Sequence, residues 1–244
     1  ALEDERIREV ALGGPDTATR TQMVWQVKLK ALGDGSKGFN CCDDFLSPEI
    51  EPTGKLAARA EPDPKSNEPC VIAPGAGYRR LENQLYRVEV HQSGNLGEAT
   101  FKWSRDNGTV ATRWLAQNGS ELTVSRLGRD EILAFAPGQW VELTDDEHEL
   151  HAKPGVLVKL KTVGDNALTI DTSKIVDPDN SSATAVDINQ FATNKKVRRW
   201  DFGDTDGPPA IKLSSGNDGW ISLEDGVEVK FSAGYYRTGD YWLI

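Results

Sequence analysis

The chain has 244 residues, a length that fits one large all-β domain or two smaller ones. Its formal net charge of −10 argues against nucleic acid as the main partner and against docking on anionic lipid, because both need a basic surface. No apolar run approaches the roughly 20 residues that a membrane-spanning helix needs.

The N-terminal third of the chain mixes short regular segments with a long irregular one. Residues 2–10 have the spacing of a short amphipathic helix, with acidic residues in its first turn. Residues 23–29 alternate apolar and polar side chains, which predicts a strand. Gly, Pro, Asp, Asn and Ser dominate residues 32–78, and loops of this length are usually functional, stapled or disordered.

The three cysteines, Cys41, Cys42 and Cys70, lie within this irregular segment. One of the two adjacent cysteines can bridge to Cys70, with Cys42 and Cys70 as the candidate pair, and would staple the loop. Buried free thiols are the next interpretation. A zinc site ranks last, because it needs a fourth ligand such as His91 and the spacing matches no standard zinc module.

Residues 84–124 predict a run of antiparallel strands. Apolar side chains recur with a period of two, which places them on one buried face of each strand. Asp106-Asn107-Gly108 and Asn118-Gly119 separate successive runs, and Asn-Gly favours two-residue hairpin turns because it accepts positive φ. We interpret the aromatic residues in these runs as core packing rather than as a platform for stacking a ligand.

Three further strands are predicted at residues 140–144, 155–163 and 167–171, punctuated by Pro-Gly and Asp-Asn turns. Their pattern predicts a small, strongly bent β-barrel over residues 127–172. The polar segment 173–194 is expected to be a surface loop, followed by C-terminal strands at 219–223, 226–231 and 240–244.

The predicted fold is therefore all-β, with antiparallel strands and hairpins, an embedded small barrel and one short N-terminal helix. Residues 1–126 would form an antiparallel region that contains the irregular loop, and 127–172 the barrel. Residues 173–244 would supply a loop and strands that complete the main sheet. The alternative is one continuous domain.

The densest cluster of reactive side chains is residues 145–151, which hold two histidines and four carboxylates. Asp145, His148 and His151 are candidate ligands for a divalent metal, or candidates for acid–base chemistry. The favoured alternative is a solvated hairpin tip, which is polar because loops face water.

A second acidic cluster, Asp201, Asp204 and Asp206, spaces oxygen ligands in a manner that suggests calcium. The EF-hand pattern fails, because Lys212 stands near the position of the bidentate glutamate. A plain acidic turn is favoured, so we expect no cofactor, with calcium as the alternative.

No nucleophile elbow, phosphate-binding glycine loop or zinc-protease motif is present. Glycoside hydrolysis needs two carboxylates across a cleft, and 38 acidic residues single out no pair. The sequence thus favours a non-enzymatic role without deciding it. Tyr235, Tyr236 and Trp200, together with Trp114, are candidate platforms for a sugar ring.

Several segments together resemble a bacterial family of large proteins of unknown function. These segments are residues 1–28, 77–91, 99–110, 133–150 and 239–244. Members of that family are longer than this chain, and the start at Ala1 rather than Met leads us to expect a piece of a longer protein. The resemblance implies association with phage-tail-like or contractile injection particles, and it supplies no catalytic residues.

From the resemblance we expect a non-enzymatic structural or attachment module of a phage-tail-like particle or bacterial surface assembly. Protein partners or self-association are expected, with a particle-associated or extracellular location rather than that of a cytoplasmic enzyme. One alternative is a carbohydrate-binding or carbohydrate-cleaving domain. A second alternative is a calcium-stabilised adhesin.

Overall fold

The computed structural model describes residues 51–61, 77–127, 134–202, 207–208, 211 and 219–244, together with Trp25 and Val27. The chain divides into two units, Ala1–Phe45 and Leu46–Ile244. The predicted N-terminal helix at residues 2–10 and all three cysteines lie outside the described residues. Of the strand predicted at 23–29, only Trp25 and Val27 are described; both are exposed and neither is in a strand.

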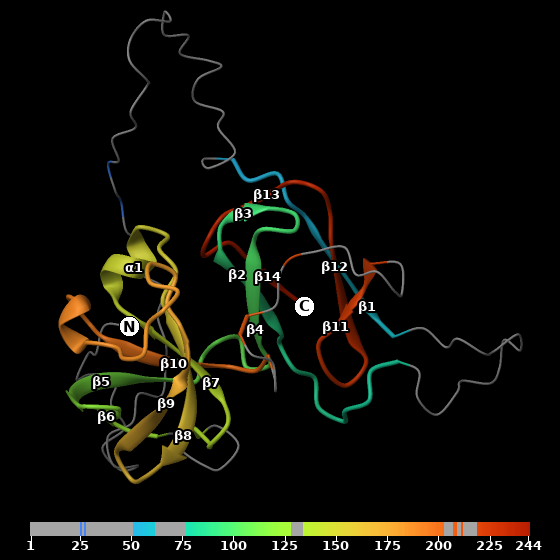
Figure 1. Cartoon of the computed structure of the whole chain (residues 1–244). Helices are drawn as coiled ribbons and strands as arrows, with labels where there is room; N and C mark the ends of the chain where they lie inside the picture. The colour runs from blue at the N-terminus through green and yellow to red at the C-terminus, as the bar shows by residue number, and fades with distance from the viewer. Residues whose placement is uncertain are drawn as a thin grey trace, which may run out of the picture. The chain divides into compact units, whose positions relative to one another are not determined.

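The described elements belong to the second unit and are labelled in Figure 1. In chain order they are β1 (Leu56–Ala60), β2 (Arg87–Gln92), β3 (Gly94–Asn95), β4 (Thr100–Ser104), β5 (Ala111–Asn118), β6 (Glu121–Val124), β7 (Trp140–Thr144), α1 (Asp146–Leu150), β8 (Val156–Val163), β9 (Ala167–Val176), the 3₁₀ helix η3 (Ile188–Gln190), β10 (Lys196–Trp200), β11 (Ile221–Ser222), β12 (Val227–Phe231), β13 (Tyr235–Tyr236) and β14 (Tyr241–Leu243). The named strands pair antiparallel throughout, so the predicted antiparallel, mostly-β architecture is confirmed. No helix in the described part of the chain is both long and apolar enough to cross a membrane.

Six strands close into a barrel in the order β10-β5-β6-β9-β8-β7. The predicted barrel at 127–172 is therefore too small, because that segment supplies only β7, β8 and the first part of β9. Three strands alone would leave two unpaired edges. Closure comes from β6, which pairs with β9, and from β10, which pairs with both β7 and β5. Segment 173–244 thus gives one strand to the barrel as well as strands to the sheets outside it.

The barrel encloses its own core of apolar side chains that point inward at alternate strand positions. This core comprises Val110, Trp114, Leu122, Val124, Phe135, Val141, Leu143, Val156, Val158, Leu160, Leu168, Ile170, Val186, Phe191 and Val197. Trp114 packs edge-on against Phe191, with ring centroids 5.2 Å apart. The interpretation of Trp114 as a core residue is confirmed.

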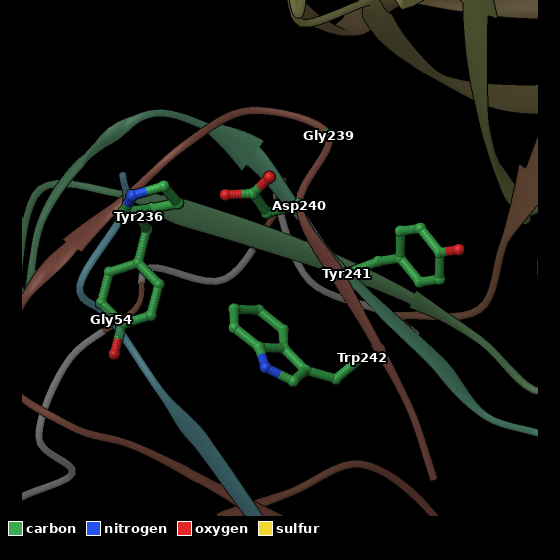
Figure 2. A pocket seen from close by; sticks show the side chains of 7 residues that line it. Gly54, Tyr236, Gly239, Asp240, Tyr241 and Trp242 are labelled. Atoms are coloured by element: carbon green, nitrogen blue, oxygen red, sulfur yellow. The ribbon is translucent and has the colours of Figure 1, made fainter. Parts of the chain in front are cut away.

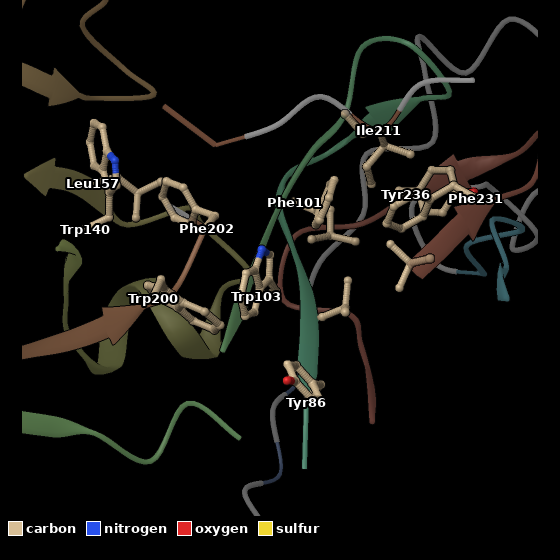
Figure 3. Packing of buried hydrophobic residues seen from close by; sticks show 14 of the residues in the cluster. Tyr86, Phe101, Trp103, Trp140, Leu157, Trp200, Phe202, Ile211, Phe231 and Tyr236 are labelled. Carbon is tan, nitrogen blue, oxygen red and sulfur yellow. The ribbon is translucent and has the colours of Figure 1, made fainter. Parts of the chain in front are cut away.

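A second core joins the sheets β14-β2-β4 and β1-β12-β11. Phe101 lies 5.0 Å from Phe231, centroid to centroid, and Tyr236 packs edge-on against the same ring. Figure 3 shows this aromatic packing continuing through Trp103 toward Trp200 and Trp140 of the barrel. The predicted role of the strand aromatics as core residues holds here too.

The two Asn-Gly turns have different roles. Gly119 joins β5 to β6 in the predicted hairpin, where Asn118 pairs with Glu121. Asn107 and Gly108 also adopt the predicted left-handed conformation, with φ of 54° and 64°. The hairpin predicted there is nevertheless wrong, since β4 pairs with β2 whereas β5 pairs with β6 and β10. The turn sets local φ angles, but barrel closure chooses the partner of β5.

Candidate functional site

The cluster at residues 145–151 lies in the connection between the antiparallel strands β7 and β8, as the favoured hairpin-tip interpretation predicted, and it forms the short helix α1 there. Asp145 caps its N-terminus: Oδ1 accepts a hydrogen bond from the backbone N–H of His148 (2.9 Å) and lies 2.6 Å from Nδ1 of its ring. The second oxygen of Asp145 accepts from the N–H of Ala192 (2.5 Å). A capping aspartate satisfies helix N–H groups that otherwise lack partners, and this favours the helix.

Hydrogen bonds within the protein engage both carboxylate oxygens of Asp145 and the Nδ1 of His148, two of the predicted metal ligands. Burial alone would raise the pKa of the Asp145 carboxyl, but hydrogen bonds from His148 and Ala192 outweigh it and lower that pKa. His151 turns its Nδ1 to the carbonyl oxygen of Glu147, 2.9 Å away. Across the described residues, no three His, Cys, Asp or Glu side chains are arranged to hold a metal ion. Asp145, His148 and His151 thus make their contacts within α1 and at its two ends, and the structure gives the metal hypothesis no support.

Asp201 also has an internal role. Its carboxylate is buried, accepts a hydrogen bond from the backbone N–H of Arg105 (3.0 Å) and lies 3.4 Å from Nε of Arg199. Asp204 and Asp206 lie outside the described residues. The one described member of the predicted calcium cluster is therefore an ion-pair partner of arginine.

The predicted sugar platforms are mostly buried. Trp200 and Tyr236 are each 1% exposed, so neither ring can stack on a ligand, and this part of the prediction is wrong. Trp200 donates from Nε1 to Glu142 (2.9 Å), and the Tyr236 hydroxyl donates to the carbonyl of Ser232 (2.5 Å). Only Tyr235 is partly exposed, because neighbouring strand residues point to opposite faces.

Where the barrel packs on the sheet β14-β2-β4, the buried side chains Glu89, Lys102 and Glu142 and the half-buried Arg87 form what we call the charged seam. Nζ of Lys102 lies 2.5 Å from Oε1 of Glu142 and 3.1 Å from Oε1 of Glu89. Arg87 pairs with Glu89 at 2.6 Å. A buried charge is tolerated when it is paired and hydrogen-bonded, and each carboxylate of the seam has a cationic partner.

A cavity of about 260 Å³ adjoins the charged seam, and Lys153 and Arg198 also line it. Beside the seam, the Nε2 of His91 donates to the carbonyl oxygen of Gly155 at 2.9 Å. Burial and the charge of Lys102 lower the pKa of His91 to about 4. Burial would raise the pKa of Glu142, but Lys102, His91 and Arg198 together hold it below its ordinary value.

At neutral pH, therefore, His91 is neutral and Glu142 is ionised. A general acid or base works best when its pKa lies near the working pH. Both groups are held away from that range, which suits a fixed structural contact better than proton transfer.

The edge of β14 carries two exposed apolar side chains. Tyr241 and Leu243 are 50% and 48% exposed. Ile244 and Tyr86 exchange both backbone hydrogen bonds (2.9 and 3.1 Å), which makes them a hydrogen-bonded pair across β14 and β2. Such pairs alternate along an antiparallel ladder, so Trp242 bonds to β2 whereas the N–H and C=O groups of Tyr241 and Leu243 point away from it.

A cavity of about 350 Å³ lies beside β14 and is lined by Pro52, Gly54, Tyr236, Gly239, Asp240, Tyr241 and Trp242. Figure 2 shows the rings of Trp242 and Tyr236 on the same side of β14, with the ring of Tyr241 on the other. Trp242 packs edge-on against Phe231 and Tyr236, at centroid distances of 6.2 Å in both cases. The carboxylate of Asp240 binds Arg237 (2.7 Å).

Sequence reasoning located the strand at 240–244 but not its position at an edge. The signal that could have found it is the uncharged run Tyr-Trp-Leu. Edge strands usually carry lysine, proline or a bulge that prevents further pairing, and this run has none of these.

Residues 47–244 match a family described as "Family of unknown function (DUF6519)". The match covers most of the chain, so the chain belongs to that family, and the predicted membership of an uncharacterised family is confirmed. No curated protein and no solved structure matches the chain. The bacterial origin and the association with phage-tail-like particles stay predictions.

Proposed function

We propose that this chain of the DUF6519 family is a non-enzymatic structural or attachment module of a phage-tail-like particle or bacterial surface assembly. The observation that supports the proposal is the edge of β14, with which no described strand other than β2 pairs and on which the side chains of Tyr241 and Leu243 are half-exposed. An exposed strand edge binds another chain by adding a strand, because its free N–H and C=O groups form a template.

The charged seam is consistent with a load-carrying scaffold. Lys102 on β4 binds Glu142 on β7, so a buried ion pair links the sheet that carries β14 to the barrel. Trp200 of β10 donates to the same carboxylate. Breaking a buried ion pair is costly, which would keep the attachment edge in a fixed position relative to the barrel.

Particles purified from the source organism provide the test. Leu243→Pro removes an N–H that points away from β2, and proline is tolerated at such edge positions. Leu243→Ala shortens the side chain and keeps the N–H, so it is the matched control. We expect immunogold labelling and mass spectrometry to find the native chain and Leu243→Ala in particles but to miss Leu243→Pro. A native chain that is found neither in the particles nor in the cell-surface fraction would refute the proposal.

A second candidate function, carbohydrate binding, is favoured by the cavity beside β14. It combines the partly exposed ring of Trp242 with the carboxylate of Asp240, and sugars bind to such pairings of an aromatic face with polar groups. A glycan array tests it with the native chain, Trp242→Ala and Tyr235→Ala. Saccharide binding that is lost in Trp242→Ala and kept in Tyr235→Ala would favour this alternative over the structural role.

A further inference from the structure

We infer that a second copy of this chain occupies the open edge of β14, with the two β14 strands antiparallel about a two-fold axis at Trp242. The inference rests on the proposed attachment role of this edge and names its first partner. The two copies would form one continuous sheet, in which two β14-β2-β4 units are joined through their β14 strands.

The backbone supports this register. Tyr241 and Leu243 direct their N–H and C=O groups outward and stand at equal distances from Trp242 along the strand. In an antiparallel copy, Tyr241 therefore meets the partner's Leu243 as a hydrogen-bonded pair, and Leu243 meets the partner's Tyr241 in the same way. Each pair exchanges two hydrogen bonds. A two-fold interface requires such mutual contacts, in which residue i meets residue j and j meets i.

The side chains are complementary in the same register. Tyr241 and Leu243 share one face of the strand, so each aromatic ring lies opposite a leucine, a favourable cross-strand combination. No residue of β14 is charged, so no like charges meet across the axis. The guanidinium of Arg87 covers one face of the Tyr241 ring, 3.6 Å from its centroid. The partner strand would therefore contact the part of the ring that Arg87 does not cover.

The cavity beside β14 accommodates the residue on the axis. Trp242 points to the opposite face from Tyr241, toward the rings of Phe231 and Tyr236 (Figure 2). The partner's Trp242 would lie directly opposite on that face, in a non-hydrogen-bonded pair, where side chains approach most closely. The adjoining space of about 350 Å³ offers room for that ring. Trp242 of one chain would then line the cavity, and the partner's Trp242 would fill it.

Other described edges are less suited to a second copy. The edge of β4 is covered by the segment after β10, because Asp201 donates its N–H to Trp103 (2.8 Å) and Ile211 donates to Ala99 (2.6 Å). The strand β1 has sequence LAARA, with a charged Arg59 and no large exposed apolar side chain. Among the described strands, β14 thus combines an open ladder with exposed apolar side chains.

The expected dimer is weak. The contact involves a strand of three residues, whereas stable complexes bury about 800 Å² on each partner. We therefore expect a mass that rises with concentration in light scattering rather than a permanent dimer.

Photocross-linking tests the register in the full chain. Benzoylphenylalanine replaces Tyr241, and ¹⁵N-labelled and unlabelled copies are mixed, so that a cross-link between light and heavy peptides proves contact between two chains. We expect position 241 to cross-link to the peptide that contains the partner's Leu243. Leu243→Pro should lose this product, and Leu243→Ala should keep it, provided that circular dichroism shows both variants folded.

Each outcome decides the inference. Cross-links to any other segment of the second copy, or a constant monomer mass at the highest soluble concentration, overturn it. If the chain is incorporated into particles but stays monomeric, the dimer is refuted and the proposed function is not. If the predicted cross-link forms but the chain is missing from particles, the dimer is supported and the proposed function is not.

Discussion

Lowering the pH from 8 to 5 should destabilise this protein, and His91 should account for most of the loss. The ring is 1% exposed and donates to Gly155, with Lys102, Glu142 and Glu89 as its charged neighbours. Its pKa falls from an ordinary value of 6.5 to about 4 in the folded chain. Between these two values the unfolded chain binds a proton at this position and the folded chain does not.

Stability rises with pH wherever the unfolded state binds more protons, so the free energy of unfolding should fall as pH drops from 6.5 toward 4. With the two pKa values of His91, the expected loss at pH 5 relative to pH 8 is about 2 kcal/mol. Glu142, whose pKa is lowered, contributes in the same direction, but mainly below the ordinary pKa of a glutamate.

Urea unfolding followed by tryptophan fluorescence at pH 8, 6.5 and 5 measures this loss. His91→Gln keeps an N–H that can donate to Gly155 and removes the titration, so its free energy of unfolding should change about 2 kcal/mol less than that of the native chain. Equal pH dependence in the native chain and His91→Gln would show that the buried ring is not responsible.

Three further predictions test the charged seam and the cap of α1 by urea unfolding at pH 7. Lys102→Met should cost about 3–5 kcal/mol, because it leaves Glu142 buried without its ammonium partner, and adding Glu142→Leu should recover part of that loss. Asp145→Ala should cost about 1–2 kcal/mol through the lost N-cap, with a smaller loss for Asp145→Asn. Gly155→Ala should cost about 1–3 kcal/mol, since a Cβ there would lie 2.6 Å from Cγ of Glu142 and 2.7 Å from the carbonyl oxygen of Leu143; an unchanged stability would contradict the packing of the seam.

Local sequence patterns predicted local structure well. The alternation of apolar residues correctly located β2 and β4, because a period of two specifies which side chains share a face, and the strands predicted at 140–144, 155–163 and 226–231 match β7, β8 and β12. Asp225 and Gly226 lie in the turn between β11 and β12, and both residues have positive φ. Each of these predictions depends only on residues a few positions apart.

The sequence predicted the roles of the candidate site residues less well than it predicted the strands. Asp145 and His148 looked like metal ligands because their types and spacing suit a metal, but a helix cap uses the same atoms. Tyr236 and Trp200 looked like sugar platforms because nothing in the sequence shows which side of a strand faces a second layer. The pairing of Lys102 with Glu142 joins residues 40 positions apart, beyond the reach of any local pattern.

The sequence by itself determined the strands, most of their turns and the inward side chains, since backbone sterics and the two-residue repeat act within a few residues. Tertiary structure alone decided that β5, β6 and β10 close the barrel, that the seam pairs its charges, and that β14 remains at an edge. The reason is that a strand's partner is chosen by whichever arrangement buries both apolar faces and satisfies the backbone of the whole sheet. That choice depends on segments far apart in the chain.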